Sequence, residues 1–171
     1  MKLLSGILIC VAVIATWSYE GWMNVHFSNN CRGRLKRSAD ANTIEIAKQE
    51  LGAAVSYLET NNSTSGYTSV IYNTPDEDVG FWYRNLKASL EELEKVPADA
   101  PPMDKTNTLM KLRETLLDHD GGKERVTCPE GMFRFPNNAF WGLVNVLSVI
   151  GEIVALFLIS VGWEERKTAW R

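Results

Sequence analysis

Two long apolar segments, one near each end of the sequence, constrain the fold of this chain more than any other feature. Leu3 to Tyr19 contains no charged residue, and Ala139 to Trp163 contains a single one in 25 residues. An α-helix rises about 1.5 Å per residue, so the second segment is longer than the roughly 30 Å hydrocarbon core of a bilayer. We therefore predict a membrane protein with two spans, residues 3–22 and 139–163, and a polar domain between them.

Residues 3–22 fit either a retained membrane anchor or a secretory signal peptide. A short basic start precedes the apolar run, and Val13-Ile14-Ala15 resembles a cleavage site. Trp17, Tyr19 and Trp22 follow at once, and such rings favour the membrane–water boundary. Of the two interpretations we favour the anchor.

Glu152 lies near the middle of the second span, where a carboxylate is costly. Asn145 and Ser148 precede it by seven and four residues, so the three side chains share one helical face. One interpretation is a carboxylate that responds to protons or ions. The other is a protonated Glu152 that hydrogen-bonds a neighbouring helix. Both predict that this polar face contacts a partner helix, and the first span is one candidate.

The region between the spans has the pattern of three amphipathic helices. Apolar residues recur every three or four positions from Ile44 to Leu58, and turn-forming residues 61–66 end that helix. An extended piece, 67–72, leads to a second helix that begins at Thr74-Pro75-Asp76-Glu77, with Thr74 as its N-cap. After a break at 97–102, a third helix is expected from about 104 to 119.

These elements define the predicted fold class. The chain is expected to be all-α, with two transmembrane helices flanking a small three-helix extramembrane bundle, residues 38–120. Residues 121–138, which begin with Gly121-Gly122, are expected to form a linker, and residues 164–171 a short polar tail.

The adjacent aromatic residues Phe81, Trp82 and Tyr83 cannot all face one small core, because neighbours on a helix point about 100° apart. One interpretation is burial against Tyr67 and Tyr72. The alternative is a protein-binding patch, in which aromatic residues are favoured anchors.

Charge is distributed unevenly along the middle of the chain. Residues 38–120 contain 15 acidic and 7 basic residues, a net charge of −8. Residues 23–37 carry four cations close together, which predicts either a basic collar at lipid head groups or a solvated linker: Arg32, Arg34, Lys36 and Arg37.

Cys31 and Cys128 stand at the two ends of the central domain. A disulfide between them would close a long loop and indicate an oxidising compartment. Positive charges beside the spans favour a cytoplasmic domain, whereas the signal-like start and the cysteine placement favour export. We expect an extracytoplasmic domain with both termini in the cytoplasm.

No catalytic constellation is visible in the sequence, and we expect neither an enzyme nor a bound cofactor or metal. Asp118-His119-Asp120 has the composition of a capped helix end, and no phosphate loop or nucleophile motif is present. The net charge of −3 gives no sign of nucleic-acid binding. The sequence favours an accessory subunit that binds other integral membrane subunits or a second copy of itself. The alternative is a sensor-like or proton-coupled component that uses Glu152.

Overall fold

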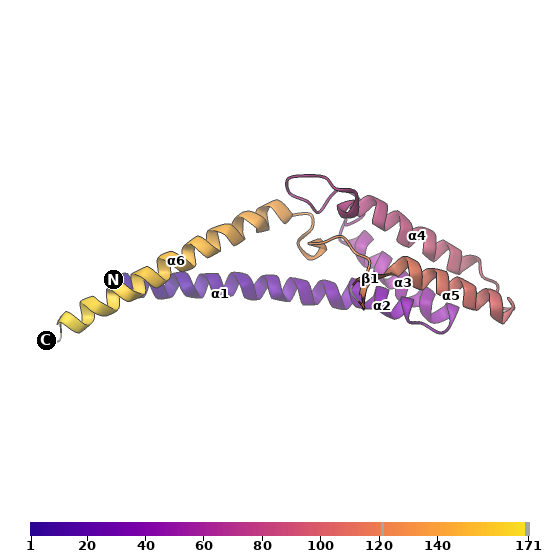
Figure 1. Cartoon of the computed structure of the whole chain (residues 1–171), viewed down its shortest axis with the longest axis horizontal. Coiled ribbons are helices and arrows are strands. Elements are labelled where there is room, and N and C mark those ends of the chain that lie inside the picture. Colours follow the sequence, from indigo (N-terminus) through magenta and orange to yellow (C-terminus); the bar gives the residue numbers. More distant parts are fainter. Residues whose placement is uncertain (121, 170–171) are drawn as a thin grey trace. The chain divides into compact units, whose positions relative to one another are not determined.

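Helices dominate the computed structural model of this chain (Figure 1), and they divide between two units. One unit comprises Met1–Met23 and Asn137–Arg171, and the other comprises Asn24–Pro136. The structure describes residues 1–120 and 122–169, so Gly121, Trp170 and Arg171 lie outside the described residues. The side chains of residues 119, 120, 123 and 169 are not described either.

In the first unit, two long apolar helices pack against each other: α1 (Lys2–Phe27), most of which lies in this unit, and α6 (Asn138–Ala169). Both helices are long and apolar enough to cross a membrane, which agrees with the predicted spans. Their outer faces expose large apolar side chains, as lipid-facing surfaces do, including Leu8, Val11, Ile14, Leu147, Ile150 and Phe157.

Small residues allow α1 and α6 to pack closely in antiparallel directions. A Cβ atom added at Gly6 would lie 2.8 Å from the carbonyl oxygen of Ala155, and one added at Gly162 would lie 2.7 Å from the backbone nitrogen of Leu3. No side chain fits at either position without a shift of backbone. Gly6 is therefore part of the helix contact within this unit.

The second unit is built from four α-helices and the short elements that join them. Beyond the end of α1, the chain forms a π-helical turn η1 (Ser28–Arg32) and continues without a break into α2 (Gly33–Ala39). The remaining helices are α3 (Ile44–Thr60), the 3₁₀ turn η2 (Pro75–Glu77), α4 (Val79–Lys95) and α5 (Pro102–Leu116).

The core of this unit lies where α2, α3, α4 and α5 meet. Apolar side chains that repeat at helical spacing supply it, and the largest fully buried ones are Leu35, Leu51, Leu58, Leu86, Leu93, Leu116 and Val79. The apolar faces predicted for α3 and α4 are therefore the faces that the structure buries.

The strict all-α expectation is wrong at the end of α5. The third helix was expected to reach residue 119, but it ends at Leu116, and Leu117–Asp120 forms strand β1. β1 pairs antiparallel with β2 (Lys123–Val126), with Leu117 opposite Val126. Leu117 is buried in the core, and an extended backbone places it there while its neighbour Asp118 stays exposed.

Two further boundaries differ from the predictions. α4 begins at Val79, because Asp78 rather than Thr74 caps it by accepting a hydrogen bond from the backbone N–H of Phe81 at 2.9 Å. Residues 121–138 are more than a linker, since they include β2 and the 3₁₀ turn η3 (Met132–Arg134), whose Met132 is buried in the core.

Candidate functional site

Asn145 of α6 faces Glu20 of α1 inside the helix pair. The side-chain amide of Asn145 donates to both carboxylate oxygens of Glu20, at 3.0 and 3.3 Å. Glu20 is only 8% exposed, so this contact satisfies a carboxylate that is otherwise costly to bury. The stacked rings of Tyr19 and Trp141, with centroids 5.7 Å apart, lie beside it.

Glu152 also faces α1. The thiol of Cys10 lies 3.9 Å from Oε1 of Glu152, while Oε2 is buried and has no hydrogen-bond partner among the described residues. A buried carboxylate oxygen without a donor is costly. Ser148, between Asn145 and Glu152 on the same face, is buried as well.

The helix pair therefore contains one continuous polar face, which we call the inner polar face: Glu20, Asn145, Ser148, Glu152 and Cys10. The contacts that cross this face, from Asn145 to Glu20 and from Cys10 to Glu152, are within one chain. The predicted residues Asn145, Ser148 and Glu152 lie together there, and α1 supplies the helix they contact. Sequence reasoning missed Glu20, although it is the acidic residue that ends the charge-free run after Tyr19.

The basic residues of the predicted collar are mostly paired inside the second unit. Arg34 contacts the carboxylate of Glu50 at 3.1 Å, and Arg37 forms a second ion pair with it. Glu50 is buried, so two guanidinium groups compensate its charge. Lys36 bonds Asp40 at 3.1 Å, and that hydrogen bond lowers the pKa of the Asp40 carboxyl.

Arg32, the fourth collar residue, points elsewhere. Its guanidinium donates to the Ser28 hydroxyl at 3.4 Å and lies 5.5 Å from the centroid of the Phe27 ring. Three of the four collar residues therefore have carboxylate partners within the second unit.

Cys31 and Cys128 are free thiols in the structure, so the predicted disulfide is not formed in it. Cys31 is fully buried in the core, and Cys128 packs against that core. The two thiols are close enough for Cys128 to affect Cys31 electrostatically. Burial raises the pKa of the Cys128 thiol to about 12, and nearby Arg32 offsets only part of that effect. Both thiols are therefore protonated and weakly nucleophilic at neutral pH.

The three adjacent aromatic residues have three different environments. Trp82 is buried, and its Nε1 donates to the backbone carbonyl of Thr127 at 2.7 Å. Tyr83 is half-buried, and its hydroxyl donates to Glu59 at 2.5 Å, which lowers the pKa of that carboxyl. Phe81 is 55% exposed, so this part of the cluster faces solvent.

Tyr67 and Tyr72, against which one interpretation placed the cluster, are both exposed. They belong to the long connection between α3 and α4, which Figure 1 shows as an open loop beside the start of α4. Its base is closed by hydrogen bonds from Thr68 N–H to the Glu77 carbonyl, at 3.1 Å, and from Val79 N–H to the Gly66 carbonyl, at 2.9 Å.

This closed base presents a set of apolar side chains to solvent. Val70, Ile71 and Tyr72 are 58%, 81% and 78% exposed. We call these three residues the apolar tip. Gly66 at its base has φ of +108°, and the ring of Phe135 lies 3.3 Å from where its Cβ would stand, so a side chain there would be strained and crowded.

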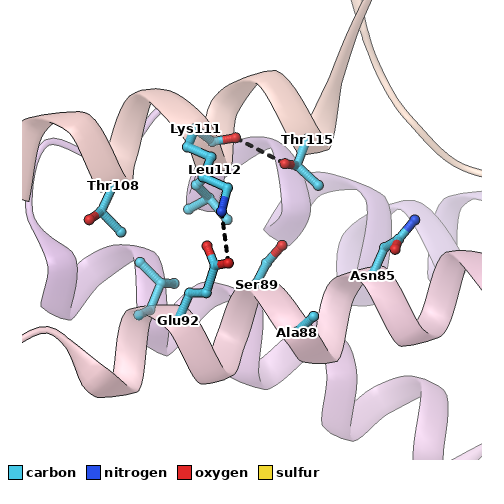
Figure 2. A pocket seen from close by; sticks show the side chains of 9 residues that line it. Asn85, Ala88, Ser89, Glu92, Thr108, Lys111, Leu112 and Thr115 are labelled. Atoms are coloured by element: carbon cyan, nitrogen blue, oxygen red, sulfur yellow. Dashed lines mark hydrogen bonds and ion pairs between the residues drawn. The ribbon is translucent and has the colours of Figure 1, made fainter.

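A small cavity of about 170 Å³ between α4 and α5 is shown in Figure 2. Across it, Lys111 of α5 bonds Glu92 of α4 at 2.8 Å, and the Thr115 hydroxyl donates to the Lys111 carbonyl at 2.9 Å. The polar groups of Glu92, Lys111 and Thr115 are thus bonded to one another. We interpret the cavity as a packing gap bridged by an exposed ion pair rather than as a ligand site.

We compared the chain with protein-family models, with curated proteins and with solved structures, and none of the three comparisons found a match. No group of three or more metal-ligating side chains occurs in the part of the chain that the structure describes.

Proposed function

We propose that this protein is a non-catalytic accessory subunit, anchored by two membrane helices, that holds another integral membrane protein through its central domain. The observation that carries the proposal is the apolar tip. Three consecutive large apolar side chains exposed on an anchored loop are unfavourable in water, and such surfaces typically bind other proteins.

The inner polar face gives less support for contact with a partner subunit than its sequence pattern suggested. Its described hydrogen bonds run between α1 and α6 of one chain, while Oε2 of Glu152 has no partner among the described residues. The proposal therefore places the partner contact on the central domain, while the outer faces of the helices meet lipid or the spans of the partner.

The proposal includes retention of the first helix. Cleavage after Ala15 would remove Lys2, Gly6 and Cys10, and α6 would lose the groups that contact Glu165, Ala155 and Glu152. It also includes an extracytoplasmic domain with both termini in the cytoplasm. The signal-like start supports that orientation, and the free thiols add no support to it.

Purification of the tagged full chain in mild detergent tests this function. The wild-type chain should retain a membrane protein in fixed stoichiometry, and a variant with Val70, Ile71 and Tyr72 changed to Ser should lose at least nine tenths of it. The matched control changes three exposed apolar residues elsewhere, Ile46, Met103 and Met110, to Ser and should retain the partner. Equal retention by both variants would contradict the proposal.

A second candidate function follows from Glu152. An ionisable side chain inside a membrane helix is a candidate functional group, and Oε2 of Glu152 is buried with no hydrogen-bond partner among the described residues. Proton flux into liposomes that contain the purified protein, followed with an internal pH dye, tests this. A flux that Glu152→Gln abolishes would favour the proton-coupled function over the accessory one.

A further inference from the structure

A groove on the second unit lies next to Phe81. It has a volume of about 400 Å³ and is bordered by η2, the first turns of α4 and the segment that follows β2. Trp82 forms part of its lining, and the hydrogen bond from Trp82 to the Thr127 carbonyl fixes one wall of the groove to the other. The exposed ring of Phe81 stands at its edge.

The charges around this groove are mostly of one sign. Five carboxylates and one guanidinium border it, a net charge of −4: Asp76, Glu77, Asp78, Asp118, Glu130 and Arg125. Asp78 caps α4, and Glu77 accepts a hydrogen bond from the Thr74 hydroxyl at 2.6 Å. The other three carboxylates, which we call the free acids, are exposed and form no ion pair in the described part of the chain: Asp76, Asp118 and Glu130.

Two other acidic side chains of this unit are paired with cations. Glu50 has Arg34 and Arg37, and Asp40 has Lys36 and Arg113. The groove differs from these sites because five carboxylates line it and Arg125 is the one basic residue among its lining residues. An aromatic face at the edge of a negatively charged cavity suits a guanidinium or ammonium group, which both features attract.

We propose that this groove binds a basic segment of the partner protein, with a Lys or Arg side chain placed against Phe81 and between the free acids. The inference rests on the proposed accessory function and specifies the chemistry of the partner. A membrane surface rich in anionic lipid does not fit, because the free acids would repel it. The proposal assigns the basic segment to the partner rather than to a second copy of this chain, whose Arg34, Lys36 and Arg37 already contact Glu50 or Asp40.

Binding of a labelled peptide to the purified full chain in detergent tests the groove directly. The probe is a short peptide of alternating arginine and leucine, and its affinity is measured by fluorescence anisotropy at low and high salt. We expect saturable binding that weakens with salt. The same peptide with glutamate in place of arginine should not bind.

Two charge-matched triple variants give the decisive comparison. Asp76→Asn, Asp118→Asn and Glu130→Gln together should weaken peptide binding at least tenfold, and Phe81→Ala should weaken it severalfold. The control triple, Glu91→Gln, Asp99→Asn and Glu114→Gln, removes the same charge from exposed acids elsewhere and should change affinity less than twofold. Equal loss in both triples, or loss in neither, would overturn the inference.

Failure of this inference can be told apart from failure of the proposed function. If the groove triple leaves both peptide binding and partner retention intact, the groove is not the binding surface, and the accessory function still stands through the apolar tip. If the wild-type chain retains no partner, the function fails, and the peptide measurement decides the groove separately.

Discussion

The indole Nε1 of Trp82 donates a hydrogen bond of 2.7 Å to the backbone carbonyl of Thr127, which joins α4 to the chain just after β2. Neighbouring Phe81 on the same helix makes no such contact and remains exposed. The two adjacent aromatic residues therefore have different roles. Trp82 stabilises the fold, and Phe81 is accessible to a binding partner.

Truncation of these two rings should therefore have unequal effects on stability. Trp82→Ala should lower the free energy of unfolding by roughly 3–5 kcal/mol, because it empties a buried site and leaves the Thr127 carbonyl unpaired. Phe81→Ala should change it by less than about 1 kcal/mol. Denaturant unfolding of the full chain in detergent, followed by circular dichroism, measures both. Small and equal losses would mean that Trp82 is not a core residue.

Glu152→Leu should weaken the contact between α1 and α6 by about 0.6–2 kcal/mol, the scale of hydrogen bonds inside membranes. Glu152→Gln should cost little, because a carboxamide keeps a hydrogen-bonding side chain of the same size at this position. Unfolding of the full chain in mixed detergent micelles checks this, with Ile153→Leu on the exposed face as the control. If Glu152→Leu is as stable as the control, the inner polar face contributes nothing to the helix pair.

The protein extracted from membranes should keep its first helix. Lys2 pairs with Glu165, and Cys10 contacts Glu152, so both ends of residues 1–15 are held against α6. Intact-mass measurement of the purified protein should give the mass of a chain that begins within its first few residues. A mass that corresponds to cleavage near Ala15 would show that residues 3–22 act as a signal peptide.

The thiols of Cys31 and Cys128 should resist alkylation in the folded protein. Burial raises the pKa of both, that of Cys128 to about 12, so neither forms an appreciable thiolate near pH 8. Mass mapping after treatment with N-ethylmaleimide should find them unmodified in the folded chain and modified after unfolding in urea. Rapid labelling of the folded protein, or a peptide that links the two residues by a disulfide, would contradict this.

The same shifts set the sign of a pH effect on stability. Because the folded-state pKa values are higher than those of an unfolded thiol, at about 8.5, the two groups contribute their full stability below that pH. This contribution decreases as the pH rises from about 9 toward about 12. In Cys128→Ala the alkaline loss of stability should be smaller than in the wild-type chain, as measured by thermal unfolding at several pH values.

The amino-acid sequence by itself determined the features that depend on local pattern. Length and hydropathy identified two helices that are long and apolar enough to cross a bilayer, because its thickness fixes how many apolar residues such a helix needs. Periodic apolar residues located α3 and α4 and their buried faces, because helical geometry places every third or fourth residue on one side. The offsets of Asn145, Ser148 and Glu152 placed them together on one face for the same reason.

Only the tertiary structure decided which distant groups these residues meet. Glu20 became the partner of Asn145 because α1 and α6 pack antiparallel, a relationship that no local pattern encodes. Leu117 left the predicted helix because strand pairing with residues 123–126 buries it in the core, and that gain depends on segments across a turn. Arg34 and Arg37 pair with Glu50, and Phe81 and Trp82 separate into surface and core, because tertiary packing decides which environment each side chain occupies.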